Sequence, residues 1–279
     1  MDHTGESFRD FELAGWEDPG VVSRYHEQLT VVTTQSVDAL LDSAQVAGGQ
    51  RVLDVASGAG YVAAAASRRG ADTVGIDFSA AQVELARRTH PGLHFEQADA
   101  QDLPFDGGSF DAVVNGFGMC HLTDPDQALR EAFRVLRPGG RIGFTVWDTP
   151  ERAIGFGAVY AAIRAYGSMD VGLPAGPNFF QFSDPSQCIG ALQAAGFTGA
   201  ACRQVPQQWR FSTPDQLFDA LAQGTVRAAA TLRAQSPKAR DEIRAVLRGT
   251  VATYMKGNDF VVPMPAVLAW AVKPVQAGA

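Results

Sequence analysis

The sequence predicts an α/β fold in which a doubly wound, mostly parallel sheet carries a helical cover. Apolar strand-like segments alternate with helical segments between residues 51 and 147, which is the pattern of a parallel sheet with helices on both faces. A glycine-rich turn follows the first of these strands directly. Because ligands of such sheets bind at the carboxyl ends of the strands, near the point where strand order reverses, we expect the functional residues there.

The segments before and within this alternation predict a regular series of elements. Residues 20–45 show apolar side chains at helical intervals, and Gly48-Gly49 ends the expected helix. The alternating part then predicts strands at 51–55, 73–77, 93–96, 110–115 and 140–146, and helices at 61–69, 80–89 and 125–136, the last ending at Pro138-Gly139-Gly140.

The alternation lapses after Trp147. Residues 150–182 are rich in glycine and aromatic side chains, and a block over 213–256 has a helical pattern without strand signals. Further elements are expected at 184–195 (helix), 200–209 (strand) and 267–272 (strand). We interpret the chain as one compact unit made of an N-terminal helical cap (1–47), a ligand-binding core (48–149) and the rest of the sheet (150–279), with an inserted helical lid at about 213–256.

Composition indicates an ordinary folded protein. The chain has 279 residues, of which 46% are hydrophobic and 19% are charged. No apolar run reaches the roughly 18–20 residues that span a bilayer, and the polar, acidic start at residues 1–6 is unlike a secretory signal. Cys120, Cys188 and Cys202 are widely spaced and suggest neither a disulfide framework nor a metal site. These features predict a cytoplasmic protein without a membrane span.

Charge is distributed unevenly along the chain. The formal net charge of −7 disfavours a general nucleic-acid binder. Residues 200–279 nevertheless carry ten Lys/Arg against five Asp/Glu, and Arg240, Arg244 and Arg248 lie at i, i+4 spacing on one helical face. This face is either a solvated helix surface or a basic wall that helps to hold an anionic substrate.

The strongest signal is the segment Asp54-Val55-Ala56-Ser57-Gly58-Ala59-Gly60, between the first strand and the first helix of the core. Its glycines allow a sharp turn and the close approach of a ligand to the helix N-terminus. Asp77, at the end of the second strand, can accept hydrogen bonds from two ribose hydroxyls. A dinucleotide-binding fingerprint, Gly58-x-Gly60-x-x-Ala63, fits the same region. Asp54 argues against it, because its carboxylate would repel a pyrophosphate and suits a cation without phosphates, such as S-adenosylmethionine.

Taken in order, the motifs of residues 51–147 resemble the class I S-adenosylmethionine-dependent methyltransferases, especially the subfamily of the ubiquinone- and menaquinone-biosynthesis C-methyltransferases. The matching segments are 52–60, 75–79, 97–105, 110–115 and 134–140. Ala56 stands where a glycine is usual, a departure that ordinary backbone torsions would tolerate. The resemblance implies a Rossmann-like sheet of seven strands with the last strand antiparallel, and S-adenosyl-L-methionine as the cofactor.

The resemblance also implies the cofactor contacts. Asp77 would bind the ribose and Phe78 would pack on the adenine, while Asn115 would contact the methionine part. Asp99 and the Ala100 amide would face the adenine amino group and a ring nitrogen. Taken singly, Asp77 also suits a helix N-terminus and Asp99 a turn. The complete set of candidate cofactor-binding residues is Tyr25, Asp54, Gly58, Gly60, Asp77, Phe78, Gln82, Asp99, Ala100 and Asn115.

Methyl transfer from a sulfonium is an in-line displacement, so the main task of the protein is to align the acceptor atom with the methyl group. His121, just beyond the fourth strand, is the candidate catalytic residue, acting as a general base for an acceptor that starts protonated. The alternative is a histidine that only lines the pocket. Tyr25 belongs to an N-terminal helix that closes over the cofactor in such enzymes. Trp147 and Phe179 are the candidate substrate contacts.

The acceptor is predicted to be a small, apolar or aromatic metabolite that takes the methyl group on oxygen, nitrogen or carbon. A nucleic-acid base is disfavoured, because Asn115-Gly116-Phe117-Gly118 stands where base methyltransferases have a Pro-Pro-aromatic sequence. Two other classes stay open. One is a nicotinamide-dependent reductase, against which Asp54 and the lack of a Tyr-x-x-x-Lys pair argue. The other is a non-catalytic protein that binds S-adenosylmethionine.

Overall fold

The computed structural model describes residues 7–275, so the first six residues of the expected N-terminal cap lie outside the described residues. The chain divides into two compact units. We name them the sheet unit (33–147, 177–205 and 266–275) and the helical unit (7–32, 148–176 and 206–265). Within residues 7–275, no helix is long and apolar enough to cross a membrane.

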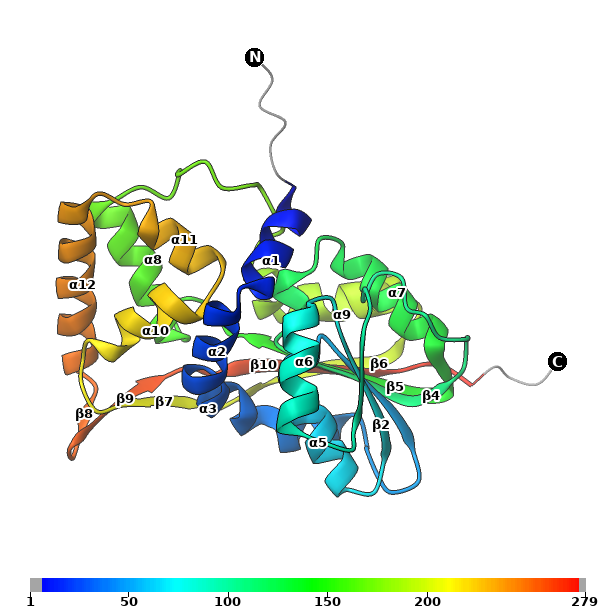
Figure 1. The fold of residues 1–279 in the computed structure, drawn as a ribbon. Helices are drawn as coiled ribbons and strands as arrows, with labels where there is room; N and C mark the ends of the chain where they lie inside the picture. The colour runs from blue at the N-terminus through cyan, green and yellow to red at the C-terminus, as the bar shows by residue number, and fades with distance from the viewer. Residues whose placement is uncertain (1–6, 276–279) are drawn as a thin grey trace, which may run out of the picture. The chain divides into compact units, whose positions relative to one another are not determined.

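The sheet unit contains the doubly wound sheet that the sequence predicts (Figure 1). Its strands are β1 (Arg51–Val55), β2 (Asp72–Asp77), β3 (His94–Gln97), β4 (Phe110–Gly116), β5 (Leu136–Trp147), β6 (Thr198–Val205) and β10 (Ala266–Val272). They lie in the order β3-β2-β1-β4-β5-β10-β6. The pairings from β3 to β5 are parallel, and β10 runs antiparallel to both β5 and β6. The mostly parallel, Rossmann-like sheet of seven strands with an antiparallel last strand is therefore confirmed.

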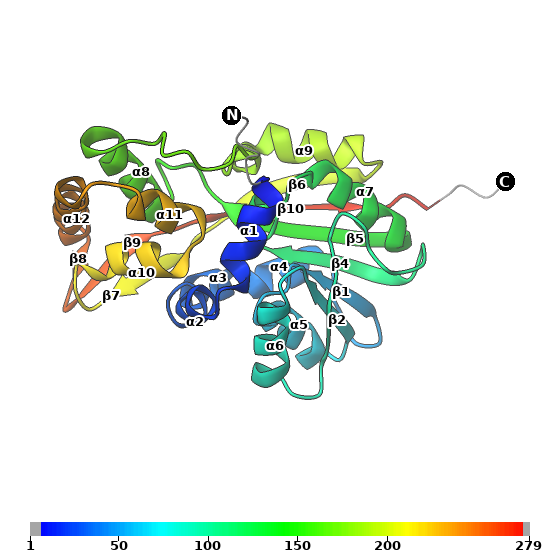
Figure 2. The same ribbon diagram turned by 45° about the horizontal axis from the view of Figure 1, so that its top comes forward.

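Helices cover both faces of this sheet. They are α4 (Val37–Ser43), α5 (Tyr61–Arg68), α6 (Ala80–Thr89), α7 (Pro125–Val135) and α9 (Pro185–Ala194), with short 3-10 turns η1 (Thr34–Ser36), η2 (Met119–His121) and η3 (Gln181–Ser183). Figure 2 shows α7 and α9 on one side of the strands and α4, α5 and α6 on the other. Alternation along β5 explains the two layers. Phe144 packs in the core beneath α7 and α9, whereas a Cβ on Gly143 would lie 3.1 Å from Leu40 of α4.

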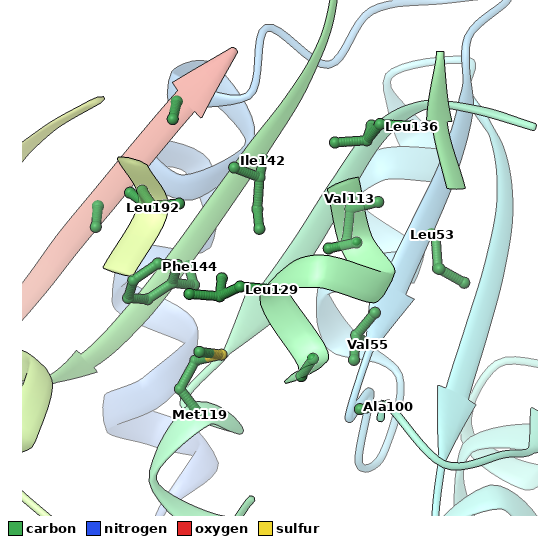
Figure 3. Packing of buried hydrophobic residues seen from close by; sticks show 14 of the residues in the cluster. Leu53, Val55, Ala100, Val113, Met119, Leu129, Leu136, Ile142, Phe144 and Leu192 are labelled. Carbon is green, nitrogen blue, oxygen red and sulfur yellow. The ribbon is translucent and has the colours of Figure 1, made fainter. Parts of the chain in front are cut away.

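The apolar core under α7 and α9 fixes the central strands. Leu129 of α7 and Leu192 of α9 belong to one cluster with Ile142 and Phe144 of β5 (Figure 3). These side chains are buried, and burial of a side chain of this size contributes about 1.5–3 kcal/mol. The same cluster includes Val55, the last residue of β1. The core therefore holds the carboxyl ends of the strands from which the loops of the candidate site leave.

Side-chain caps explain why two of the helices begin where the sequence predicts. Ser79 accepts a hydrogen bond from the Gln82 amide at the start of α6. Asp124 accepts one from the Gln127 amide at the start of α7. Pro125 occupies the first turn of α7, where its missing N–H removes no helical hydrogen bond. Such caps are local signals and are therefore visible in the sequence.

The turn into β5 differs from the prediction. α7 ends at Val135 and β5 begins at Leu136, so Pro138-Gly139-Gly140 lies within the strand and not before it. The Gly139 amide donates to the Lys273 carbonyl, and the Lys273 amide donates to the Gly140 carbonyl, each at 2.8 Å. This pairing just beyond the end of β10 draws the glycines into the sheet. It is a long-range contact without a local signal.

The single N-terminal helix expected over 20–45 is wrong. The chain forms α2 (Pro19–Gln28), α3 (Thr30–Thr33), η1 and α4 in this region. Hydroxyl groups bond to nearby backbone carbonyls at the interruptions, from Thr30 Oγ1 to His26 and from Ser36 Oγ to Thr33. Such bonds compete with the helical backbone pattern and bend helices. The chain passes from the helical unit to the sheet unit in the same segment, at residues 32–33.

The helical unit combines helices with a small antiparallel sheet. Its helices are α1 (Phe8–Glu17), α2, α8 (Ile154–Tyr166), α10 (Gln216–Gly224), α11 (Arg227–Arg233) and α12 (Pro237–Ala252). The strands β7 (Gln208–Phe211), β8 (Met255–Lys256) and β9 (Asp259–Pro263) lie in the order β7-β9-β8. The strand expected over 200–209 is divided near Pro206 between β6 of the main sheet and β7 of the small one. The helical pattern of 213–256 is confirmed up to Ala252, and its role as a lid stays a prediction.

Helix α8 lies where no helix was expected, because glycines interrupt the sequence pattern. A Cβ on Gly157 would lie 1.8 Å from the Pro150 carbonyl oxygen, and one on Gly155 would lie 2.8 Å from Met264 Sδ. Glycine therefore permits two close approaches that any side chain would prevent. The two glycines that interrupt the helical pattern in the sequence are therefore required by the packing of α8.

Two of the three arginines on α12 form ion pairs inside the helical unit. Arg244 pairs with Asp219 at 2.7 Å, and Arg248 pairs with Asp215 at 2.8 Å. The Arg244 guanidinium also lies 4.2 Å from the centre of the Phe218 ring. These arginines tie α12 to α10 and to the residue before it. The interpretation of this face as a basic wall for an anionic substrate therefore loses its support.

Candidate functional site

The candidate site lies at the carboxyl ends of the parallel strands in the sheet unit. β1 has β2 on one side and β4 on the other, so strand order reverses beside β1, where ligands bind in open α/β sheets. Val55 ends β1, Asp77 ends β2 and Gly116 ends β4. The segments 56–60, 78–79 and 117–122 that follow these strands therefore leave from the same edge of the sheet.

The loop after β1 contains three left-handed residues. Ala56, Gly58 and Gly60 have φ angles of 52°, 51° and 82°. A Cβ on Gly60 would lie 2.5 Å from the Phe95 ring, so only glycine fits there. Alanine at position 56 would replace the usual glycine without strain only if its torsion angles were ordinary. Its positive φ angle shows that they are not. This conformation costs a residue with a Cβ roughly 1–2 kcal/mol, which the surrounding structure must offset.

Asp77 organises the glycine loop from the neighbouring strand. Its Oδ2 accepts a hydrogen bond from the Gly58 amide at 2.9 Å, and its Oδ1 accepts one from the Ser79 amide at 3.0 Å. The side chain is buried. Gln82, in the first turn of α6, is buried beside the same loop, and its Oε1 would lie 3.9 Å from a Cβ on Gly58. Asp77 thus links the loop after β1 to the start of α6.

Asp54 has a different set of partners. Its Oδ2 accepts a hydrogen bond from the Ala63 amide at 2.9 Å, in the first turn of α5. Gly60 stands at the N-cap of α5 and offers no side chain, so Asp54 performs the capping from the strand. Its Oδ1 is buried and has no hydrogen-bond partner in the described part of the chain. One oxygen of this buried carboxyl therefore has its hydrogen-bonding capacity unused within residues 7–275.

The surroundings of Asp54 oppose its negative charge. The pKa of Asp54 is raised to about 8, chiefly by burial; the hydrogen bond from Ala63 lowers it, and the nearby Asp77 carboxylate raises it. Burial therefore favours the protonated form of this carboxyl. A cation placed at Oδ1 would favour the ionised form, so the group is suited to bind positive charge.

The residues proposed for the adenine end lie after β2 and β3. The Phe78 carbonyl accepts a hydrogen bond from Gln97 Nε2 at 2.9 Å. Asp99 Oδ1 accepts one from the Gln101 amide at 2.9 Å and so shapes the turn after β3. Ala100 is buried in the apolar core. The structure brings these residues to the same sheet edge as Asp77, and their contacts with an adenine stay a prediction.

Asn115, in β4, spans the two central loops. Its Nδ2 donates to the Val55 carbonyl at 2.9 Å, and its Oδ1 accepts from the amides of Gly118 and Met119 at 2.9 and 3.2 Å. The side chain is buried. These bonds to backbone groups were not expected from the sequence, which only assigned Asn115 a contact with the methionine part of the cofactor.

The substrate candidates form two ring contacts within the sheet unit. His121, at the end of η2, is half-buried and meets the Phe179 ring edge-on, with centroids 6.1 Å apart. Trp147, at the end of β5, lies 4.4 Å from the Phe117 ring. The Trp147 carbonyl accepts a hydrogen bond from Ser183 Oγ at 2.7 Å. Aromatic side chains thus lie at the end of β5 and in the segment after β4.

Tyr25 belongs to α2 of the helical unit, where its ring packs edge-on against Trp16 at 5.2 Å. Its contact with a cofactor stays a prediction. Two residues of the sheet unit were not selected from the sequence. Ser57 Oγ, in the glycine loop, is buried without a hydrogen-bond partner among the described residues. Phe117 has a φ angle of 62°. Neither has a sequence signal, because serine is ordinary in turns and a torsion angle is set by tertiary contacts.

Comparison with known proteins singles out the part of the chain that carries these loops. Residues 53–144 match a family model described as a methyltransferase domain. The match covers about a third of the chain. It includes Asp54, the glycine loop, Asp77, Asp99 and Asn115, and it leaves out Trp147 and Phe179.

Curated relatives match the chain over part of its length and part of their own. The demethylmenaquinone methyltransferase of Clavibacter sepedonicus is 45% identical over 123 residues, which are 43% of this chain and 47% of that protein. The ubiquinone/menaquinone biosynthesis C-methyltransferase of Idiomarina loihiensis is 39% identical over 122 residues, which are 40% of this chain and 49% of that protein. The chain thus spans about half the length of these curated relatives.

Solved structures extend the likeness of fold beyond residues 53–144. A putative methyltransferase from Bacillus halodurans has a TM-score of 0.54 and 20% identity, covering 86% of this chain and 99% of that one. Phosphoethanolamine N-methyltransferase 2 of Haemonchus contortus, in complex with S-adenosyl-L-methionine, has a TM-score of 0.58 and 20% identity, covering 98% of this chain and 61% of that one. At this identity the fold alone is shared.

Proposed function

We propose that the protein is an S-adenosylmethionine-dependent methyltransferase that acts on a small molecule. The observation that carries the proposal is the Asp54 carboxyl, which is buried at the start of α5 and has one oxygen without a partner in the described chain. A buried carboxyl favours a nearby cation. The ammonium and sulfonium groups of S-adenosylmethionine are cations, and the molecule has no phosphates. The methyltransferase domain at the same loops supports this assignment.

The residues around Asp54 fit the remainder of the cofactor. Gly58 and Gly60 leave the loop without side chains, so a ligand can approach its backbone. Each Asp77 oxygen accepts a backbone N–H, and a carboxylate is also a suitable acceptor for ribose hydroxyls. A nicotinamide dinucleotide fits less well, because its pyrophosphate would approach the loop beside Asp54 without bringing the cation that this carboxyl favours.

The chemistry places few demands on the chain. S-adenosylmethionine supplies an activated methyl group on a good leaving group. The residues of the site need to hold the acceptor atom in line with that methyl group and to exclude water. Alignment of this kind lowers the barrier by roughly 7–11 kcal/mol.

An apolar or aromatic acceptor fits the side chains that follow β4 and β5. Phe117 and Trp147 contact each other, as do His121 and Phe179. Aromatic side chains favour offset or edge-on contacts with another aromatic ring. The names of relatives that methylate quinone precursors agree with an aromatic acceptor. We infer a small-molecule partner of this class and not a nucleic acid.

His121 is the proposed general base for an acceptor that must lose a proton. An unperturbed imidazole titrates near neutral pH and can accept a proton there. An acceptor that is already ionised would need no base, and His121 would then only line the pocket beside Phe179. The acceptor atom therefore decides between these two roles.

Calorimetry with three ligands tests the cofactor assignment. S-adenosylmethionine and its demethylated product should bind, and NADH should not. Tighter binding of NADH would replace the proposal with a reductase. A screen of metabolite pools for consumption of S-adenosylmethionine then tests catalysis. Binding without turnover on any pool would favour a non-catalytic S-adenosylmethionine-binding protein.

A further inference from the structure

Asn115 joins two loops of the candidate site through its side-chain amide. One end of the amide donates to the carbonyl of Val55, the residue before the glycine loop. The other end accepts from the amides of Gly118 and Met119, which follow β4. The side chain is 5% exposed, and a hydrogen bond away from water is electrostatically stronger than one at the surface.

A strained residue lies beside each end of this bridge. Ala56 directly follows Val55 and has a φ angle of 52°, and Phe117 directly precedes Gly118 and has a φ angle of 62°. The left-handed conformation is disfavoured for any residue with a Cβ, and it is most unusual for a bulky one. Such strain persists only where the surroundings over-determine it, and it is concentrated at functional sites.

The two strained turns also touch each other. A Cβ on Gly118 would lie 2.6 Å from Ala56 Cβ, so the absence of a side chain at Gly118 makes room for Ala56. The same turn places the Phe117 ring against Trp147. It also leads directly into η2, where the His121 amide donates to the Gly118 carbonyl at 3.0 Å. The conformation of one loop therefore constrains the other.

We propose that Asn115 is a positioning residue that holds Ala56 and Phe117 in the left-handed conformation. Its amide thereby sets the shape of both the glycine loop (56–60) and the segment 117–122 that follows β4. This inference rests on the proposed function for its binding test. It differs from a direct contact with the methionine part of the cofactor, because Oδ1 already accepts two backbone N–H groups and Nδ2 donates to the Val55 carbonyl.

A cycle of Asn115→Ala and Ala56→Gly tests the proposal by calorimetry with S-adenosylmethionine. Asn115→Ala should weaken binding at least tenfold, because the loop after β1 relaxes. Ala56→Gly alone should change the affinity less than threefold, because glycine adopts this conformation without strain. In the double variant, glycine should recover at least fivefold of the lost affinity. A loss that Ala56→Gly does not alter would overturn the proposal and make Asn115 a direct cofactor contact.

Thr145→Val is the matched control. Thr145 is buried in β5, and its Oγ1 has no hydrogen-bond partner within residues 7–275. Removal of this hydroxyl breaks no hydrogen bond of the side chain, so the affinity should stay within twofold. A loss equal to that of Asn115→Ala would mean that any buried polar substitution disturbs the site, which would also overturn the proposal.

A measurement without ligand separates this inference from the proposed function. Asn115→Asp keeps an acceptor for Gly118 and Met119 but removes the donor to Val55, and it serves if Asn115→Ala does not fold. Ala56→Gly should raise the urea midpoint of the wild-type protein, and it should raise that of Asn115→Asp by at most half as much. An equal increase in the urea midpoint of the wild type and of Asn115→Asp would overturn the inference. Failure of the wild-type protein to bind S-adenosylmethionine would instead overturn the proposed function, while the urea cycle still decides the role of Asn115.

Discussion

The ends of β1 and β2 each place a buried carboxyl at the same edge of the sheet, and the two groups differ in how their oxygens are used. Both oxygens of Asp77 accept backbone N–H groups, one from the glycine loop and one from the start of α6. Only one oxygen of Asp54 does so, from the first turn of α5. The other is buried without a partner among the residues described.

This difference separates a group that builds the loop from a group that is suited to bind. Two backbone N–H groups stabilise the charge of a carboxylate before any ligand arrives. The Asp54 carboxyl has one such bond, and burial dominates, so its pKa rises to about 8. Asp77 is thus held in place by the fold, whereas the second oxygen of Asp54 is the one that we propose faces the cationic part of the cofactor.

Substitution of Asp77 should have the largest effect. Asp77→Ala leaves the amides of Gly58 and Ser79 without their acceptor, and it removes the proposed ribose contacts. We expect a loss of at least tenfold in affinity for S-adenosylmethionine, and a loss of about 1–3 kcal/mol in the free energy of unfolding for each buried group left unpaired. The protein should still fold. Calorimetry and urea unfolding measure the two losses.

The control for Asp77 lies at the other end of the same strand. Asp72 begins β2 and is exposed, so Asp72→Ala should change neither quantity appreciably. If Asp77→Ala bound S-adenosylmethionine with an unchanged dissociation constant, the assignment of Asp77 to the ribose would be removed. Asp77 would then act on the structure of the glycine loop and not on the ribose.

Substitution of Asp54 should change how stability depends on pH. Its pKa in the folded protein is about 8, against an ordinary value of 3.8. Because the folded state holds the proton more strongly, this contribution to stability is fully present below about pH 4 and is lost as the pH rises towards 8. Asp54→Asn has no titrating group at this position, so its stability does not fall for this reason. The free energy of unfolding of the variant relative to the wild type should therefore increase over this range, by at most about 1.4 kcal/mol per pH unit. Urea unfolding from pH 4 to 8 measures the difference, and a constant difference would contradict the prediction.

The affinity for S-adenosylmethionine should instead increase with pH, and this increase should require Asp54. A cation at Oδ1 favours the ionised carboxyl, so binding releases a proton, and the affinity of the wild type should rise between pH 6 and 8 by up to about tenfold per unit. Asp54→Asn should bind more weakly at pH 8 and lose this slope. Glu131→Gln is a suitable control, since Glu131 accepts a backbone hydrogen bond from Leu103 at 2.8 Å elsewhere in the sheet unit. A slope that persists in Asp54→Asn would assign the proton to another group.

The contrast between Asp54 and Asp77 shows where prediction from the sequence ends. Both residues, the glycines between them and the strands that carry them follow from local signals, namely apolar runs, glycine spacing and helix caps. Which oxygen lacks a partner does not follow, because it depends on how α5 meets β1. The φ angles of Ala56 and Phe117 depend in the same way on contacts between loops that are far apart in the chain.

The helical unit was less predictable for a related reason. Its small sheet pairs β7 with β9, although about fifty residues separate them in the chain. Helix α8 was hidden by Gly155 and Gly157, which its neighbours require to be small. Pro206 interrupts what looked like one strand and directs its two halves to different sheets. In each case a tertiary contact overrides the local pattern.

Substitution of His121 should have the smallest effect. It tests whether the site needs a general base in addition to the carboxyls of Asp54 and Asp77. The imidazole packs against Phe179 and lies on the turn that follows β4, whereas cofactor binding is assigned to the ends of β1 and β2. His121→Asn should therefore leave the affinity for S-adenosylmethionine within about twofold. Turnover should fall less than about tenfold over pH 6–9 if the acceptor is ionised on binding, since a base then contributes little. A thousandfold fall with unchanged cofactor affinity, steepest at low pH, would instead show that the acceptor arrives protonated and that His121 removes its proton.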